Sequence, residues 1–282
     1  MTAHPVKTFK QHLYASVKLG VPFVLMQITI MFINVTDTLM LGWLGVKELA
    51  AGTLAFQLVF AAYIFGLGIS SALMPLVSSA VGRNDLEAVR RNVRMGLWVL
   101  SIAVTILMIP MLFGKEILIA LGQDPELAAL AQTYIDIAQW SLIPVFLLTG
   151  LRNFLASLEH TSTILTITIL MALLNALLNY AFIFGNFGAP RLEIQGAAIA
   201  TCIVNVIGLV CLVLYVKFSV FCKPYAIFKR FWIPEWSAFR EIIKIGLPIS
   251  MMIFFEAGMF LAAALMIGWI GEIELAAHGI SI

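Results

Sequence analysis

The sequence has 282 residues, of which 62% are hydrophobic and 11% are charged, and its mean hydropathy is +1.02. Soluble domains carry about 25% charged residues, so this composition excludes a soluble globular protein and predicts an integral membrane protein. The formal net charge of +2 identifies no binding partner, and we expect no nucleic acid as a partner. The three cysteines, Cys202, Cys211 and Cys222, form no CxxC pair, and we expect free thiols.

The first long apolar segment lies between Lys18 and Lys47 and contains a single acid, Asp37. About 20 apolar residues are enough to cross a bilayer, so we predict a spanning helix that ends near residue 43. At ~1.5 Å per residue, Asp37 lies about 7 Å beyond the midpoint of this helix, still within the hydrocarbon. A carboxylate there costs at least ~2.5 kcal/mol unless it faces a cavity or a partner. We therefore interpret Asp37 as a proton or ion site.

The rest of the chain alternates long apolar segments with short polar turns. Residues 2–17 suggest a short interfacial segment before the first helix, and five more spanning helices are predicted at 49–81, 86–113, 125–157, 162–184 and 196–218. Pro144 is expected to bend the helix that contains it. Asn84 or Asp85 is expected to cap the next helix, in which Glu87 and Arg91 are four residues apart on one face.

Residues 219–240 are aromatic and basic, a composition typical of a linker that lies at the membrane interface. A seventh helix is predicted at 239–269, and an eighth begins before residue 282. The domain organisation that follows has three parts. Residues 1–218 form a first lobe of six spanning helices, residues 219–240 form a linker on the cytoplasmic side, and residues 241–282 form the start of a second lobe.

Residues 18–56 align with residues 244–282 without a gap, and 13 of the 39 positions are identical, including glycine, proline and tryptophan positions. Such a long internal repeat indicates a duplicated helix bundle, and two periods of 226 residues imply a parent chain of roughly 450 residues. The predicted fold is therefore an all-α membrane protein with a six-helix N-lobe and the first helix of a parallel second six-helix repeat. We expect the chain to be the N-terminal part of such a parent.

Basic residues are distributed unequally between the two predicted sides of the membrane. Of the 17 lysines and arginines, 14 lie on the side of the N-terminus and the linker, Arg152 among them, and three lie on the other side. The positive-inside rule then places the N-terminus in the cytoplasm. On this count we expect no basic residue within a span.

Polar residues within the predicted spans share faces of their helices. Gln27, Asn34 and Asp37 lie at spacings of seven and three residues, so they form one stripe on the first helix. Asn175 and Asn179 lie four residues apart on the fifth helix. Single asparagines in membrane helices often serve only interhelical hydrogen bonds, worth about 0.6 kcal/mol each. Two on one face, together with an acid on another helix of the same lobe, favour a polar cavity.

The seventh helix contains a second acid, Glu256, close to its centre. The repeat aligns Glu256 with Ile30, seven residues before Asp37, so the two acids face the same way within their copies and Glu256 lies about 10 Å nearer the cytoplasm. A carboxyl group bonded to a neighbouring carbonyl would be the structural alternative. An acid at the helix centre is better explained as an ion or proton ligand.

No motif for catalysis is present. The sequence has no GxxxxGK[ST], HExxH or GxSxG pattern, so we expect neither an enzyme nor any catalytic residue or cofactor. The four histidines lie at predicted helix ends or in loops, which gives no metal ligand set apart from a possible Na⁺ at Glu256. A membrane scaffold would need no acid in its spans, but it remains an alternative from another class.

Four segments of the chain carry a family resemblance: VTDTLMLGWLG in the first helix, NALLNYAFIFG in the fifth, LEIQGAAIAT at the sixth and FFEAGMF in the seventh. Together they resemble the multidrug and toxic compound extrusion (MATE) transporters, in particular the NorM-like bacterial branch. Asn179 departs from one branch of that family, which has an aspartate there, and Ile33 stands where a tyrosine is sometimes found.

The resemblance implies a twelve-helix antiporter of the bacterial inner membrane, monomeric when complete, that exports drugs and organic cations in exchange for Na⁺ or H⁺. By this similarity, Asp37 is the coupling acid of the N-lobe, Asn175 and Asn179 are the polar pair beside it, and Glu256 is the cation-binding acid of the C-lobe. Lipophilic or cationic small molecules would be its substrates. A flippase for lipid-linked oligosaccharides is the alternative within transport.

Overall fold

The computed structural model describes residues 9–268, and this part of the chain is mostly helical, without a strand. Ten α-helices and two short 3₁₀-helices follow one another in the described residues. Their bounds are α1 Phe9–Gly42, α2 Val46–Ser71, α3 Leu73–Gly82, α4 Leu86–Met111, α5 Gly114–Ala120, α6 Pro125–Ala138, η1 Gln139–Ser141, α7 Leu142–Ser157, α8 Thr161–Phe184, α9 Glu193–Phe218, η2 Lys223–Tyr225 and α10 Trp236–Gly268. The predicted all-α membrane fold is confirmed.

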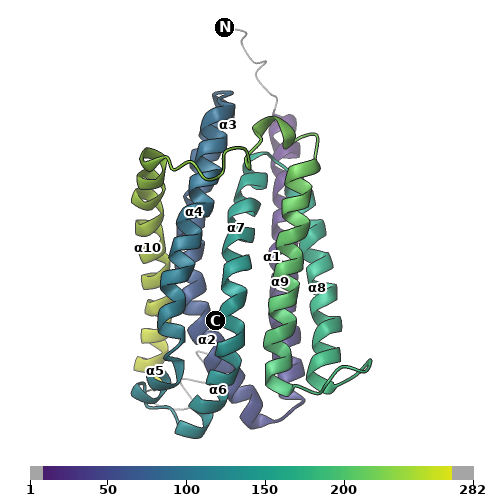
Figure 1. Ribbon diagram of the computed structural model, residues 1–282, viewed down its shortest axis with the longest axis vertical. Helices are drawn as coiled ribbons and strands as arrows, with labels where there is room; N and C mark the ends of the chain where they lie inside the picture. Colours follow the sequence, from purple (N-terminus) through teal and green to yellow (C-terminus); the bar gives the residue numbers. More distant parts are fainter. Residues whose placement is uncertain (1–8, 269–282) are drawn as a thin grey trace.

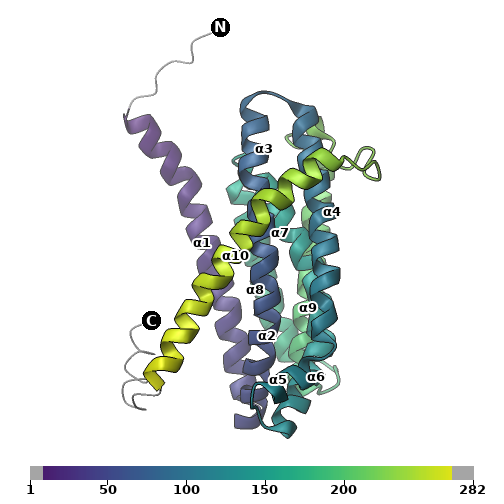
Figure 2. The same ribbon diagram turned by 90° about the vertical axis from the view of Figure 1, so that its left-hand side faces the viewer.

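The long helices stand side by side as an upright bundle (Figure 1). Seven segments of the described residues are long and apolar enough to cross a membrane. The first turn of α1, the α3–α4 connection and the segment between α9 and α10 lie at one end, and α5 and α6 lie at the other. Helix α1 packs on α8, and α10 packs on α2. Both helices lean away from the bundle, on the same side of it (Figure 2).

Two of the predicted spanning helices are broken in the structure. The segment predicted as one helix at 49–81 is divided at Ala72 into α2 and α3. Pro75 explains the break, because its ring lacks a donor and collides with the carbonyl four residues earlier, at Ser71. The segment 125–157 passes from α6 to α7 through the 3₁₀-helix η1, which ends three residues before Pro144, and the bend expected at Pro144 stays a prediction.

Short polar segments begin the helices much as the sequence indicates. The Asp85 carboxylate accepts a hydrogen bond from the Ala88 amide at 2.9 Å, so Asp85 caps α4. Asp124 caps α6 in the same way, with Pro125 at the first helical position. Helix α5 was not predicted as a separate element. Its first turn is held by Gln132, whose side-chain oxygen accepts from the Lys115 amide at 2.7 Å.

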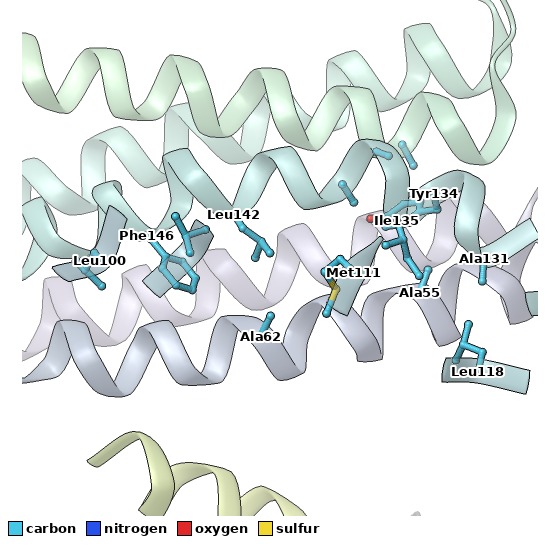
Figure 3. Packing of buried hydrophobic residues seen from close by; sticks show 14 of the residues in the cluster. Ala55, Ala62, Leu100, Met111, Leu118, Ala131, Tyr134, Ile135, Leu142 and Phe146 are labelled. Atoms are coloured by element: carbon cyan, nitrogen blue, oxygen red, sulfur yellow. The ribbon is translucent and has the colours of Figure 1, made fainter. Parts of the chain in front are cut away.

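The hydrophobic core lies between α2, α4, α6 and α7 and combines alanines with large side chains (Figure 3). Gly66 of α2 packs against the ring of Phe146, and a Cβ at position 66 would lie 2.1 Å from the ring atom Cζ. Gly68 approaches α10 so closely that a Cβ there would lie 2.3 Å from the Ser250 Cα. The Ser250 hydroxyl donates to the Phe65 carbonyl at 2.8 Å. Small residues thus allow α2 to contact both α7 and α10.

The segment between α9 and α10, residues 219–235, is bonded along α4. Arg90 Nε donates to the Tyr225 carbonyl at 2.9 Å, and the Trp98 indole donates to the Phe231 carbonyl at 3.2 Å. Arg94 donates to the Arg230 carbonyl at 3.0 Å and also pairs with Glu235. This segment, called the linker below, is therefore an ordered part of the bundle.

Arg91 of α4 has a neighbour that its spacing from Glu87 does not indicate. Its Nε lies 3.6 Å from Glu235 Oε2 of the linker. The reason is that Arg94 already fixes Glu235 against α4, which brings a carboxylate near Arg91 that sequence spacing alone does not reveal. The three cysteines are free, as predicted.

Candidate functional site: the Asp37 cluster and the cavity between α1, α2 and α6

The Asp37 side chain points from α1 towards α8. Asn179 Nδ2 donates a hydrogen bond to Asp37 Oδ1, and the same amide nitrogen lies 3.2 Å from Asn175 Oδ1. Both asparagines are fully buried. The structure therefore brings together the acid of the first predicted span and the polar pair of the fifth. The contact follows from the packing of α1 on α8, because residues four apart on α8 present one face to α1.

The amide of Asn179 leaves one polar atom without a partner. Its Oδ1 is buried and accepts no hydrogen bond from any described residue. Buried polar groups are satisfied in the great majority of cases, so an unpaired carbonyl oxygen beside a carboxylate is unusual. Such an oxygen can accept a hydrogen bond or coordinate a cation. The cluster can therefore take up a proton or a small hard cation without losing an existing bond to Oδ1.

A cavity of about 170 Å³ opens beside Asp37. It lies between α1, α2 and α6, and its polar groups are carboxyl, amide and hydroxyl groups. Its lining residues are Asn34, Asp37, Thr38, Leu41, Leu49, Gly52, Thr53, Phe56 and Tyr134. A cavity with several polar partners is large enough to hold water or a hydrated ion. It gives Asp37 access to solvent that a lipid-facing carboxylate would lack.

Of the residues that line this cavity, only Asn34 and Asp37 were predicted as site residues; the hydroxyl groups of Thr38, Thr53 and Tyr134 were missed. Tyr134 is buried on α6 near Ile135 and Ala131 (Figure 3). The segment QTYIDIAQW contains one more signal that was missed, the acid Asp136 within the span 125–157. Asp136 is exposed, and it accepts a hydrogen bond from Gln132 at 2.5 Å. An unusual density of polar residues in this segment is the signal that could have found Tyr134 and Asp136.

Two predicted site residues lie apart from the cavity. Gln27 is exposed on α1 and does not line it, whereas Asn34, one turn before Asp37, does. Glu256 lies on an exposed face of α10 next to Phe255, and no hydrogen bond or ion pair joins it to any residue whose side chain the structure describes. The two acids are thus not neighbours in this structure. The role of Glu256 stays a prediction.

The expectation that the spans contain no basic residue is wrong. Arg90, Arg94 and Lys217 lie within described spans, and so does Arg152. It lies within the span 125–157, on α7, and its guanidinium turns inward rather than towards the end of the bundle. The Nη2 atom donates to the Thr168 hydroxyl at 3.3 Å and approaches the Met171 sulfur at 3.7 Å. Arg152 does not line the cavity beside Asp37. A count of charges by side could not place it, because an arginine near a predicted helix end can point either way.

No cluster of three or more histidine, cysteine, aspartate or glutamate side chains that could hold a metal ion occurs among the described residues. The oxygen atoms around Asp37 come instead from one carboxylate, three amides and several hydroxyls. Neutral oxygen ligands with a single negative charge match a proton or a monovalent cation better than a divalent ion, which normally recruits several carboxylates.

Comparisons with known proteins agree on one family. The family model described as MatE matches residues 22–181. Two curated relatives, both named "Probable multidrug resistance protein NorM", come from Rhizobium meliloti (strain 1021), with 45% identity, and Agrobacterium fabrum (strain C58 / ATCC 33970), with 41%. Each alignment covers 96% of this chain and 58% of the relative. The chain thus spans less than two thirds of the length of these relatives.

Solved structures share the fold. The eukaryotic MATE transporter AtDTX14 superposes with a TM-score of 0.83 at 21% identity, covering 92% of this chain and 57% of that one. A MOP superfamily transporter from Pyrococcus furiosus gives a TM-score of 0.80 at 20% identity, covering 93% and 57%. At these identities the likeness concerns the arrangement of the helices alone.

Proposed function

Because the chain belongs to the MatE family, we propose that it forms the N-lobe and the first C-lobe helix of a secondary active antiporter for multidrug efflux. The antiporter exports drugs and organic cations in exchange for Na⁺ or H⁺ and needs no cofactor. The relatives named as multidrug resistance proteins support efflux. The cluster of Asp37 with Asn179 and Asn175 supports ion coupling, and it is the observation that carries the proposal.

The proposed mechanism uses the charge of Asp37. An ionised Asp37 attracts a lipophilic cation into the N-lobe cavity and accepts the Asn179 amide bond that joins α1 to α8. Binding of a proton or Na⁺ at Asp37 neutralises the carboxylate, and the unpaired Asn179 Oδ1 is the acceptor available to the new donor or cation. The bound substrate then loses the negative charge of Asp37 that attracted it, and the contact between α1 and α8 changes. Inward- and outward-open states then exchange in population.

Glu256 is proposed as the cation-binding acid of the C-lobe, with Gln27 and Asn34 as polar residues on the substrate side of α1. The exposed face of α10 that carries Glu256 supports this assignment, because a charged side chain near the middle of a span needs a polar cavity or a partner. The complete protein is proposed to be a monomer in the bacterial inner membrane. The first turn of α1 and the linker lie at the same end of the bundle (Figure 1), which is rich in basic residues, and this supports a cytoplasmic location for the N-terminus and the linker.

The two alternatives have less support. A flippase for lipid-linked oligosaccharides would need basic residues in the cavity to hold a pyrophosphate. None of the residues that line the described cavity is lysine or arginine, and Arg152 contacts Thr168 and Met171 instead. A membrane scaffold would gain nothing from the buried, unpaired oxygen of Asn179. Efflux by an antiporter accounts for both observations.

The test is Asp37→Asn in cells that produce the protein at the full length of its relatives. We expect ion-driven efflux of a cationic dye to fall at least tenfold, because the carboxylate that exchanges substrate for ion is removed while the hydrogen-bonded geometry is kept. The matched control is Asp136→Asn, an acid in another span that does not line the cavity. Its efflux should be unchanged. Imposed Na⁺ and pH gradients, applied separately, identify the coupling ion.

Normal efflux by Asp37→Asn would contradict the role of Asp37, and equal losses in both variants would show that any acid in these spans is needed for folding. Infrared spectroscopy of the purified 282-residue chain adds a readout without transport. A carboxyl band that responds to pH or Na⁺ should vanish in Asp37→Asn and persist in Asp136→Asn.

A further inference from the structure

A second cavity of about 170 Å³ lies at the C-terminal end of α9, where the helix passes into the linker. Its wall combines apolar side chains with three lysines. The lining residues are Val216, Lys217, Cys222, Lys223, Ala226, Ile227, Phe228 and Lys229. Cys222 and Ile227 are almost completely buried beneath it, so the floor is part of the folded linker rather than a loose surface loop.

The charge of this cavity is entirely positive. Lys217, Lys223 and Lys229 are exposed, and none of the residues that line the cavity is acidic. Among the described residues no ion pair involves these three lysines. Lys217 Nζ lies 5.4 Å from the centre of the Phe218 ring. Three ammonium groups around one apolar cavity form a site that attracts an anion carrying an apolar portion.

The arginines of the same region are already occupied. Arg90 and Arg94 donate to linker carbonyls, and Arg94 also pairs with Glu235. These guanidinium groups hold the linker on α4, so they serve the fold. The lysines line the cavity instead, and none of the residues that line it carries a carboxylate. The arginines are therefore structural, whereas the lysines remain available to a ligand.

An apolar stripe on α9 leads directly to the lysines. Ile207, Val210 and Leu214 are exposed at spacings of three and four residues, and the stripe continues to Phe218. Helix α9 has 26 residues, about 39 Å at 1.5 Å per residue, which exceeds a hydrocarbon thickness of about 30 Å. The last turn of α9 and its Lys217 therefore lie at the depth of the lipid headgroups.

We propose that this lysine cavity binds the phosphodiester headgroup of an anionic phospholipid, whose acyl chains lie along the exposed stripe of α9. Ammonium groups at this depth attract anionic headgroups, and the apolar stripe supplies the contact that a free phosphate could not use. Exposed Val220 and Phe221 of the linker extend the apolar surface beside the cavity. A lipid bound here links the end of α9 to the linker, which is itself bonded to α4.

The test compares lipid binding by the purified 282-residue chain and two triple variants. Phosphatidylglycerol and phosphatidylcholine are offered in mixed micelles, and the bound lipid is counted by native mass spectrometry. Lys217→Gln, Lys223→Gln and Lys229→Gln together should weaken phosphatidylglycerol binding at least about tenfold, since each lysine near the surface contributes to the attraction. Phosphatidylcholine binding should not change.

The matched control removes the same charge elsewhere. Lys10, Lys18 and Lys244 are exposed, lie on the same predicted side of the membrane and are outside the cavity, so Lys10→Gln, Lys18→Gln and Lys244→Gln together should keep phosphatidylglycerol binding. Equal losses in both triple variants would show diffuse attraction and overturn the proposal, as would no loss in either. Far-ultraviolet circular dichroism confirms that each variant remains helical.

Glycerol 3-phosphate separates a lipid site from a site for a free phosphate. It carries the headgroup chemistry without acyl chains, so at millimolar concentration it should displace little phosphatidylglycerol. Displacement at the same concentration as the lipid itself would overturn the assignment to a lipid. Because this readout needs no transport, it is independent of the proposed antiport.

Discussion

The cavity at Asp37 and the junction of α4 with the linker both keep charged groups away from bulk water, but they do so differently. At the junction, Arg94 is buried and pairs with a carboxylate and a backbone carbonyl, and Arg91 and Arg90 add further contacts, while the Nε atoms of Arg91 and Arg94 have no hydrogen-bond partner among the described residues. At the cavity, Asp37 has only neutral amides, one of which retains an unpaired oxygen. A buried cation that is paired with a carboxylate fixes the fold, whereas a carboxylate bonded only to neutral amides keeps a charge that an ion can neutralise. The difference distinguishes structural from functional charge in this bundle.

Arg94→Ala is expected to give the largest effect on stability. It leaves Glu235 without its main partner and removes the bond to the Arg230 carbonyl. Buried ion pairs cost 3–5 kcal/mol when one partner is lost, but Glu235 is 36% exposed, so we expect about 2 kcal/mol. The midpoint of unfolding by sodium dodecyl sulfate measures it. Arg91→Ala is the control, because that pair is 3.6 Å apart with both side chains more than a third exposed, and it should cost less than about 0.5 kcal/mol.

Trp98→Phe tests whether the neutral bonds of the junction also matter. The indole donates to the Phe231 carbonyl at 3.2 Å and its ring contacts Phe231 and Trp232. Phenylalanine keeps part of the ring contact but loses the donor, so a loss of about 1 kcal/mol is expected in the same unfolding titration. No change at all would mean that the arginines alone hold the linker.

Asp37→Asn is expected to leave stability almost unchanged, within about 0.5 kcal/mol, in contrast to its proposed effect on efflux. The variant keeps a polar acceptor for Asn179 and removes a charge from the interior of the membrane. A loss as large as that of Arg94→Ala would show that Asp37 is structural. The comparison drawn above would then fail.

Cys222 gives the smallest and most local prediction. Burial raises the pKa of the Cys222 thiol, so less thiolate exists at a given pH and alkylation by iodoacetamide should reach half of its maximal rate at a higher pH than for an ordinary thiol. Arg94→Ala should loosen the linker and speed the reaction at pH 8. Mass spectrometry of the Cys222 peptide follows it. An unchanged rate would show that the linker stays in place without the ion pair.

Sequence reasoning recovered the parts of the site that depend on spacing along one helix. Asn175 and Asn179 could be placed on one face, and Asp37 stood out because a charge within an apolar segment is costly. Their meeting requires α1 to pack on α8, which the periodicity of either helix does not specify. The break at Ala72 could have been read from Pro75.

Other features depend on contacts between distant segments. Tyr134 lines the cavity only because the core places α6 beside α1 and α2. Arg91 lies close to Glu235 because the linker folds back on α4. Arg152 shows the same limit. Its position near a predicted helix end gave no sign of whether the guanidinium would turn inward, and only the packing of α7 against α8 decides this.

The close approach of Gly68 to Ser250 has a mechanical consequence. Helix α10 belongs by repeat to the second copy, yet its backbone is seated against α2, and the linker before it is bonded to α4. The boundary between the two sequence repeats therefore differs from the boundary of the tightly packed bundle. In the proposed transporter, a movement between the two lobes would therefore carry residues 236–250 of α10 with the first six spans, and we expect α10 to bend after Ser250, in the part that holds Glu256.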